Sequence, residues 1–133
     1  MASPVPREHR PRLRRVWIAY WIGLFAATHW PKPPHLPGPA DVSDKVVHFC
    51  LYFGLAMLGC VAARGASSGC RCRAGWGWTL RWTGVYAGYA GVDEWLQPFF
   101  GRTADPWDWV CDVAGVVCAM IAARGMLARR GPA

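Results

Sequence analysis

The chain has little polar sequence with which to cover its apolar segments. Only 17% of its 133 residues are charged, whereas 53% are hydrophobic and nine are Trp. The apolar residues fall into four blocks, 16–29, 46–63, 76–92 and 107–128. Helices that are apolar on every side must be buried in lipid or in a larger protein. The shortage of polar residues therefore argues against a soluble helical domain and favours a membrane protein.

The chain also lacks the cysteine patterns of a disulfide framework or a zinc finger. Four of its six cysteines fall inside the apolar blocks, where a thiol packs as a small apolar group. Cys70 and Cys72 lie between the second and third blocks, without a second Cys or His pair at zinc-finger spacing. We therefore predict no cofactor and assign no metal ligands from motifs.

Acidic residues are scarce, with eight against 15 basic residues. Twelve of the 15 basic residues lie in three places. These are the segment before the first block, the segment from the end of the second block to the first residues of the third, and the end of the fourth block. Glu8 is the only acid that accompanies them. The other two loops hold Lys32, Lys45, Arg102 and the remaining acids. Such sorting argues against nucleic-acid binding. By the positive-inside rule it places both termini and the middle loop in the cytoplasm.

These patterns predict an all-α fold, a four-helix transmembrane bundle in the cytoplasmic (inner) membrane with both termini cytoplasmic. A span needs about 20 apolar residues, and the second block fits best. Residues 1–12 are expected to form a basic, disordered tail, and residues 13–130 the membrane domain. Ser43 is the expected N-cap of the second helix. Gly84 and Gly88 are expected to allow close helix packing.

Five of the eight acids occur between Asp93 and Asp112. Asp105 has the features of a helix N-cap, and Asp108 suits the first helical turn. Asp112 follows Asp108 by one turn on the same face, deeper in the span. Like charges at this spacing repel, so in apolar surroundings the pair needs a cation, a shared proton or a metal. Capping remains the alternative reading of Asp105 and Asp108.

The start of the second helix carries an acid and a histidine on one face. Asp44, His48 and Tyr52 are spaced four apart. Asp44 can orient the imidazole and raise its pKa, which makes His48 a candidate acid or base. The alternative is a capping Asp with a His that packs at the interface.

The third helix ends with two acids, Asp93 and Glu94, and Gln97 follows Asp93 by four. Acids at a helix C-terminus oppose the helix dipole, so helix stability does not account for them. Pro98 is expected to end the helix, before a turn that dips into the membrane.

All of these polar groups fall on the outer side under the charge-derived topology. We therefore predict that they form one outward-facing polar site. Its candidate residues are Asp44, Lys45, His48, Tyr52, Asp93, Glu94, Gln97, Arg102, Asp108 and Asp112.

The ordered set of Asp44-Lys45, His48-Phe49, Tyr52, Tyr89, Asp93-Glu94, Gln97, Arg102, Asp108 and Gly115 resembles the VanZ-like family of small bacterial membrane proteins. The resemblance covers roughly residues 44–118. The resemblance implies a membrane protein of the cell envelope. The family is named for a protein associated with low-level teicoplanin resistance. The resemblance supplies no catalytic mechanism. The family carries Asn where this chain has Asp112.

The leading hypothesis is a VanZ-like integral membrane protein that contributes to glycopeptide (teicoplanin-type) resistance. Its outward-facing polar site would bind or shield headgroups of envelope lipids, lipid-linked precursors or polymers, without known catalysis. One alternative is a membrane-embedded hydrolase or transferase on lipid-linked phosphates. In it His48 would be the acid/base or nucleophile, Lys45 and Arg102 would bind phosphate, and the acids would hold Mg²⁺. The other is a proton-coupled small transporter that uses Asp112.

Overall fold

The computed structural model describes residues 9–30, 40–65 and 75–128. These residues form helices and short connections, with no strand among them. The all-α prediction is confirmed for this part of the chain. The elements are α1 (His9–Thr28), α2 (Ala40–Gly65), α3 (Trp76–Leu96), the 3-10 helix η2 (Gln97–Phe100) and α4 (Pro106–Ala128).

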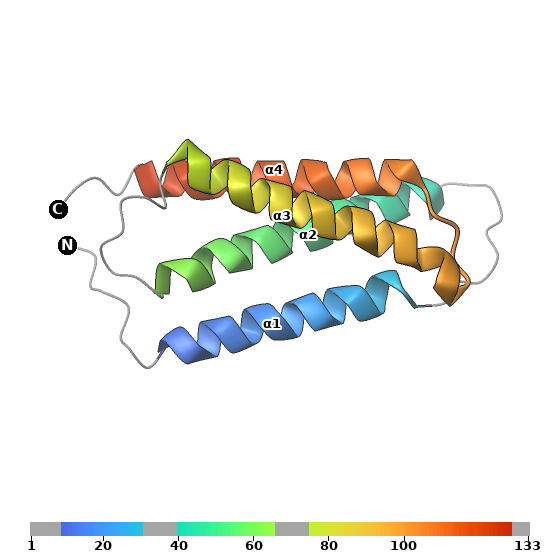
Figure 1. Cartoon of the computed structure of the whole chain (residues 1–133), viewed down its shortest axis with the longest axis horizontal. Helices are drawn as coiled ribbons and strands as arrows, with labels where there is room; N and C mark the ends of the chain where they lie inside the picture. The colour runs from blue at the N-terminus through green and yellow to red at the C-terminus, as the bar shows by residue number, and fades with distance from the viewer. Residues whose placement is uncertain (1–8, 31–39, 66–74, 129–133) are drawn as a thin grey trace.

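The four long helices run antiparallel to their chain neighbours, so that the molecule has two distinct ends (Figure 1). The first residues of α1 and the last residues of α4 lie at one end. The last residues of α1 and α3 lie at the other, with the first residues of α2 and α4. We call the second the acidic end, because six of the described side chains there are carboxylates: Asp44, Asp93, Glu94, Asp105, Asp108 and Asp112.

Helices α2 and α4 make the most extensive contact in the bundle. Gly115 of α4 permits it, because a Cβ at this position would overlap the carbonyl oxygen of Phe49 and lie 3.1 Å from the Phe53 nitrogen. Gly84 and Gly88 of α3 behave differently. Nothing in the described structure lies within 4 Å of a Cβ built at either of them, so the close packing predicted there is wrong.

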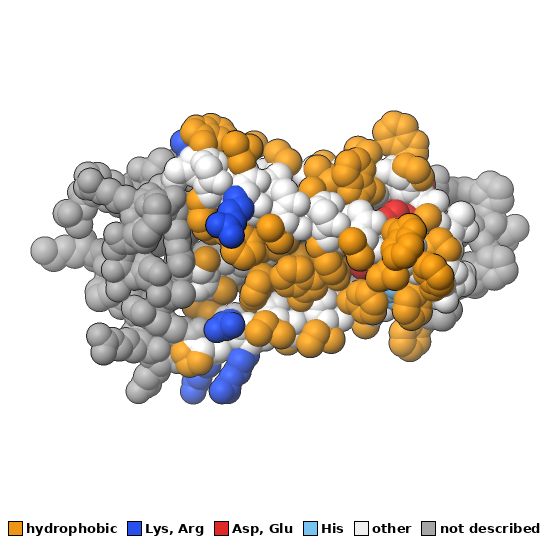
Figure 2. All heavy atoms as spheres, in the orientation of Figure 1, with side chains coloured by type: hydrophobic (Ala, Val, Ile, Leu, Met, Phe, Trp, Pro, Cys, Tyr) orange, Lys and Arg blue, Asp and Glu red, His pale blue; other side chains and the backbone are white. Residues whose placement is uncertain are grey.

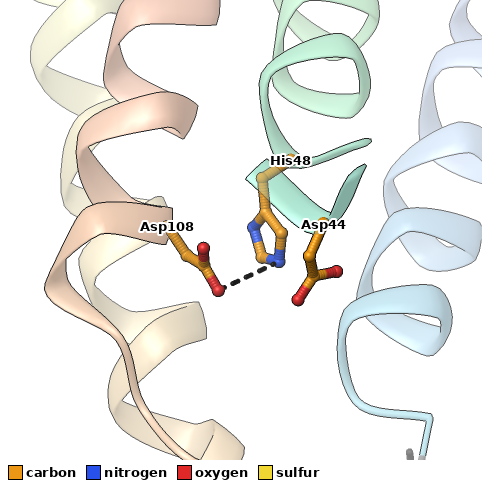
Figure 3. A group of neighbouring side chains, drawn as sticks. All are labelled: Asp44, His48 and Asp108. Atoms are coloured by element: carbon orange, nitrogen blue, oxygen red, sulfur yellow. Dashed lines mark ion pairs between the residues drawn. The ribbon is translucent and has the colours of Figure 1, made fainter. Parts of the chain in front are cut away.

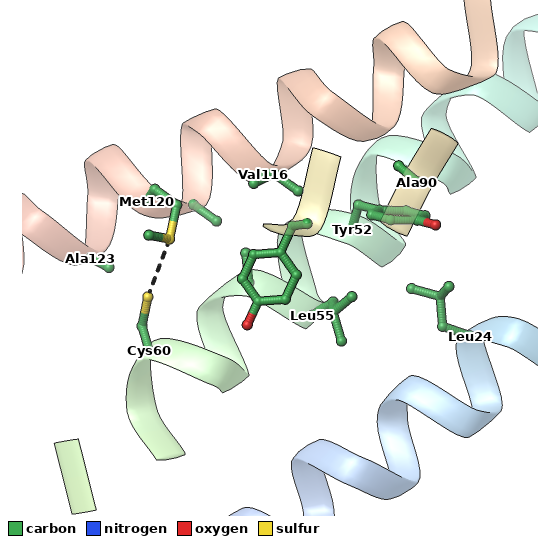
Figure 4. Close-up of a cluster of buried hydrophobic side chains, with 11 residues drawn as sticks. Leu24, Tyr52, Leu55, Cys60, Ala90, Val116, Met120 and Ala123 are labelled. Carbon is green, nitrogen blue, oxygen red and sulfur yellow. Dashed lines mark hydrogen bonds between the residues drawn. The ribbon is translucent and has the colours of Figure 1, made fainter. Parts of the chain in front are cut away.

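The core lies between α2, α3 and α4 and is closed on one side by α1 (Figure 4). Helix α1 contributes the buried Leu24, together with aromatic contacts to α3. The ring of Trp21 lies 5.9 Å from that of Tyr86 and 4.9 Å from that of Tyr89, measured between centroids. The other buried side chains of the core are Tyr52, Leu55, Ala56, Cys60, Ala90, Val116, Ala119, Met120 and Ala123.

Two predicted boundaries differ from the structure, and a third agrees with it. Helix α2 begins at Ala40, so Ser43 lies inside the helix and is not its N-cap. Helix α1 begins at His9, so residues 9–12, which were expected to be disordered, are helical. Pro98 does end the α-helix, as predicted, but the chain continues as η2 and turns at Gly101, which has a φ of 73° in the left-handed region. The remaining tail and loop predictions fall on residues 1–8, 31–39 and 66–74, outside the described residues.

Among the described residues, two helices are long and apolar enough to cross a membrane. They are the segments Asp44–Ala63 of α2 and Pro106–Met126 of α4. Figure 2 shows hydrophobic side chains over the middle of the molecule, with basic side chains near one end and acidic side chains towards the other. Many large apolar side chains of the bundle are exposed, including Ile22 of α1 and Leu80 of α3. Large exposed apolar surfaces are typical of proteins that contact a membrane or another protein.

Candidate functional site

His48 of α2 lies between two carboxylates of α4. Its Nδ1 is 3.1 Å from Oδ1 of Asp112, within hydrogen-bond distance, and its Nε2 is 3.7 Å from Oδ2 of Asp108. All three residues are buried. The one-turn spacing of Asp108 and Asp112 places one carboxylate near each ring nitrogen of His48.

Asp44 also faces His48, as the one-turn spacing on α2 predicts. One ligand atom from each of Asp44, His48 and Asp108 can be chosen so that all lie within 4.8 Å of one another (Figure 3). Nδ1 of the imidazole lies within hydrogen-bond distance of Oδ1 of Asp112, a contact that the sequence did not predict. Asp44 forms an ion pair with Arg102, at 3.4 Å between Oδ2 and NH2.

Arg102 connects the η2–α4 loop to two other helices. Besides the ion pair with Asp44 of α2, its NH1 donates a hydrogen bond to the backbone oxygen of Thr28 at the end of α1. Its side chain is only 6% exposed. The guanidinium therefore donates hydrogen bonds to a carbonyl at the end of a helix and to a carboxylate at the same time. Its several N–H donors in one plane make this possible.

Asp105 and Lys45 form the more exposed rim of this cluster. Oδ1 of Asp105 accepts a hydrogen bond from the backbone N–H of Trp107, which confirms Asp105 as the N-cap of α4. Its Oδ2 pairs with Lys45 Nζ at 3.0 Å, and the same ammonium lies 3.7 Å from Asp108. The Trp107 N–H and the Lys45 ammonium hold the pKa of the Asp105 carboxyl below its usual value.

The two acids at the end of α3 have separate partners. Asp93 Oδ1 accepts a hydrogen bond from the Thr28 hydroxyl at 3.2 Å and lies 3.5 Å from Nδ1 of His29. Glu94 accepts a hydrogen bond from the backbone N–H of Asp105. These contacts explain why acids are tolerated at this helix C-terminus, since each one anchors a neighbouring segment.

Thr28 and His29 were not among the predicted site residues, although both are buried beside Asp93. They are the last two residues of the apolar segment 16–29, and this position is the feature of the sequence by which they could have been found. A polar pair at the outer end of a predicted span faces the same side as the acids, but the sequence does not reveal which helix it contacts.

Gln97 and Tyr52 are buried at the acidic end without satisfying their polar groups. Within the described part of the chain, neither amide atom of Gln97 has a hydrogen-bond partner. The Tyr52 hydroxyl makes no hydrogen bond of normal geometry there either, although the Asp93 carboxylate is near it. Four buried carboxylate oxygens likewise accept no hydrogen bond from a described residue. They are Oδ2 of Asp93, Oε2 of Glu94, Oδ1 of Asp108 and Oδ2 of Asp112.

The structure thus brings all ten predicted site residues to one end of the bundle. Leaving a buried polar group without a partner costs about 1–3 kcal/mol, and more for a charged group. The unsatisfied oxygens lie among six carboxylates, with only Lys45 and Arg102 as permanent cations among the described side chains there. Such a site attracts protons, metal ions or cationic groups.

A large cavity of about 680 Å³ lies away from this site. It is lined by apolar side chains such as Trp17, Trp82 and Met120, with Arg14 and Arg15 among its lining residues. Because it shares none of the acidic-end residues, it does not contribute to the chemistry described above.

Comparison with protein-family models, with curated protein sequences and with solved structures finds no match to this chain. The functional assignment therefore rests on the arrangement of its own residues.

Proposed function

We propose that α1, α2, α3 and α4 all cross the cytoplasmic membrane, with both termini in the cytoplasm. The supporting observation is the segregation of charge along the bundle. Arg12, Arg14, Arg15, Arg81 and Arg124 lie towards the end opposite the six carboxylates, with exposed apolar side chains between the two groups. The positive-inside rule assigns the Arg-rich end to the cytoplasm. The acidic end then faces outwards.

We further propose that the chain is a VanZ-like protein of the bacterial cell envelope that contributes to glycopeptide (teicoplanin-type) resistance. Its acidic end binds or shields polar headgroups of envelope lipids, lipid-linked precursors or polymers. The observation that carries this proposal is the group of buried, unsatisfied polar atoms at that end, which include both amide atoms of Gln97 and one oxygen each of Asp93 and Asp112. Buried polar groups are normally paired, so this group is suited to a ligand that supplies the missing partners.

The charge of the site selects the class of headgroup. Six carboxylates face two permanent cations, and both cations already contact carboxylates: Arg102 with Asp44, and Lys45 with Asp105. Ammonium groups of an envelope lipid or polymer would therefore be attracted. A phosphate would be repelled unless a bound cation lay between it and the carboxylates.

The same contacts disfavour the hydrolase or transferase alternative in its original form. Lys45 and Arg102 were its phosphate ligands, yet both are engaged by carboxylates. The transporter alternative needs ionisable groups along the whole path. The described ionisable cluster stops at Asp93 and Asp112, beyond which α2 and α4 meet through apolar core residues. Headgroup binding at one face is the function that this arrangement supports best.

Cysteine accessibility in cells tests the topology. In a chain whose six cysteines are replaced by Ser, Thr103→Cys marks the acidic end and Gly75→Cys marks the opposite end, and both positions are exposed. A membrane-impermeant maleimide should label Thr103→Cys in intact cells, and Gly75→Cys only after permeabilisation. The reverse pattern, or labelling of both in intact cells, would overturn the topology.

Teicoplanin susceptibility tests the function. Expression of the chain in a susceptible bacterium should raise the inhibitory concentration, and Asp93→Ala or Arg102→Ala should abolish that increase at an unchanged amount of protein in the membrane. Arg81→Ala is the matched control, because Arg81 is exposed and lies outside the site. Full protection by both site variants would contradict the proposed function.

A further inference from the structure

We infer that Asp44, His48 and Asp108 form a binding site for a divalent metal ion. The three side chains come from two helices, α2 and α4, and converge at the acidic end with Nε2 of His48 directed towards a carboxylate oxygen of Asp108 (Figure 3). Asp44 and His48 are one turn apart on α2, so a single helix supplies two of the three ligands.

The separation of the ligand atoms is close to that of a metal centre. One atom from each side chain lies within 4.8 Å of the others. Ligands bound at about 2.0–2.2 Å from one ion lie no more than about 4 Å apart. Ion binding therefore requires the side chains to move inwards by about 1 Å or less, which rotation of the carboxylates provides.

His48 is held in the orientation that a metal ligand needs. Its Nδ1 lies 3.1 Å from Asp112 Oδ1. Donation of the Nδ1 proton to this carboxylate leaves the Nε2 lone pair facing Asp108. A carboxylate that accepts a hydrogen bond from the other nitrogen of a metal-binding histidine is the usual second layer of such a site, since it fixes the tautomer and makes the ligand more basic. Asp112 is a positioning residue in this arrangement.

An independent observation also points to a missing cation. Asp108 is 4% exposed, and its Oδ1 accepts no hydrogen bond in the described structure. The nearest ammonium, Lys45 Nζ, lies 3.7 Å from it. This distance is long for a charge-assisted hydrogen bond. A divalent ion beside Asp108 would supply the partner that its Oδ1 lacks among the described residues.

The ligand set favours a transition metal. Imidazole nitrogen suits Zn²⁺, Mn²⁺ or Fe²⁺, whereas Ca²⁺ and Mg²⁺ prefer oxygen ligands alone. Three protein ligands leave at least one coordination position open. If the proposed headgroup binding is correct, that position would accept a phosphate or carboxylate oxygen and remove the repulsion of the surrounding acids. The metal site itself does not depend on that function.

Metal binding by the purified full-length chain in detergent tests the inference. Mn²⁺ is the first probe, because the thiolates of the chain's six cysteines are poor ligands for it. Electron paramagnetic resonance of free Mn²⁺ should show about one ion bound per chain. Zn²⁺ should displace it, since Zn²⁺ binds nitrogen and oxygen sites more tightly. The affinity tag must be free of histidine.

The variants separate loss of a ligand from loss of the fold. His48→Gln and Asp108→Asn should each abolish Mn²⁺ binding, and His29→Gln, which removes a buried histidine outside the three-ligand group, should leave it unchanged. Asp112→Asn keeps an oxygen that can accept the hydrogen bond and should weaken binding by about 10–100-fold. Helicity and elution volume are checked for each variant.

Two results would overturn the inference: no retention of Mn²⁺ or Zn²⁺ by the folded wild-type chain, or unchanged binding in folded His48→Gln and Asp108→Asn. Because these measurements use purified protein, their failure would leave the maleimide-labelling and teicoplanin results standing. A failure of those cellular tests would likewise leave the metal stoichiometry intact.

Discussion

His48 and Asp112 are within hydrogen-bond distance across the α2–α4 interface, at 3.1 Å between Nδ1 and Oδ1, although they are 64 residues apart in the chain. Both side chains are at most 2% exposed. This contact joins α2 and α4, the two described helices whose lengths and apolar composition suit a membrane. It also determines which ring nitrogen of His48 faces Asp108.

Removing either partner of this pair should destabilise the bundle strongly. Asp112→Ala or His48→Ala leaves a buried polar group unpaired, which costs about 1–3 kcal/mol, and more if the remaining group is charged. The double variant should cost less than the sum of the two, with a coupling energy of about 0.5–3 kcal/mol. Unfolding in detergent with increasing sodium dodecyl sulfate, followed by tryptophan fluorescence, measures all three. Additive effects would show that the two side chains do not interact.

Gly115→Ala should loosen the α2–α4 contact, because the new methyl group would overlap the carbonyl oxygen of Phe49. Overpacking of this kind typically costs about 1–3 kcal/mol. Gly125→Ala in the same helix is the matched control, since nothing described lies within 4 Å of its Cβ. In a helix interior that change alone should be stabilising by about 0.5–1 kcal/mol. The same unfolding assay compares them, and equal effects would argue against the close approach at Gly115.

Helical spacing allowed the prediction of contacts within one helix. Asp108 and Asp112, and likewise Asp44 and His48, share a face because they are four residues apart. Charge sorting then placed both pairs at the same end of the bundle. The N-cap role of Asp105 also followed from local sequence, since a capping residue acts on the turn that follows it.

Contacts between helices could not be predicted in the same way. The pairing of Asp93 with Thr28 and His29 depends on α1 lying beside α3, and periodicity does not specify which helices are neighbours. The error at Gly84 and Gly88 has the same cause, because their spacing identifies a small-residue face but not whether another helix covers it. The contact of Asp112 with Nδ1 of His48 was not predicted for the same reason, since it joins α4 to α2.

Arg102→Gln should detach the η2–α4 loop from α1 and α2. The guanidinium donates to the Thr28 carbonyl and to Asp44 simultaneously, and hydrogen bonds to charged groups contribute about 1.5–3 kcal/mol. Arg102→Lys should recover only part of this stability, because one ammonium lacks the planar fork. Proteolysis at the loop reports its release. Arg81→Gln, an exposed position, should change stability by no more than about 0.5 kcal/mol, and a similar loss there would contradict the role of Arg102.

Asp105 gives the bundle an acid-sensitive connection. The Trp107 N–H and the Lys45 ammonium lower its pKa in the folded chain below the ordinary value of 3.8. A carboxyl whose folded pKa is depressed contributes stability above its unfolded pKa, and that stability is lost as pH falls through the folded pKa. Stability should therefore decline below about pH 4, and Asp105→Asn should show a smaller decline. Asn also caps helices well, so the comparison isolates the charge rather than the cap.

Unfolding by sodium dodecyl sulfate between about pH 2 and pH 6 measures the stability of both chains. Because Asp105 is 35% exposed, the difference between them should be small and should be reduced by salt. Identical pH profiles would show that the Lys45–Asp105 ion pair contributes no net stability.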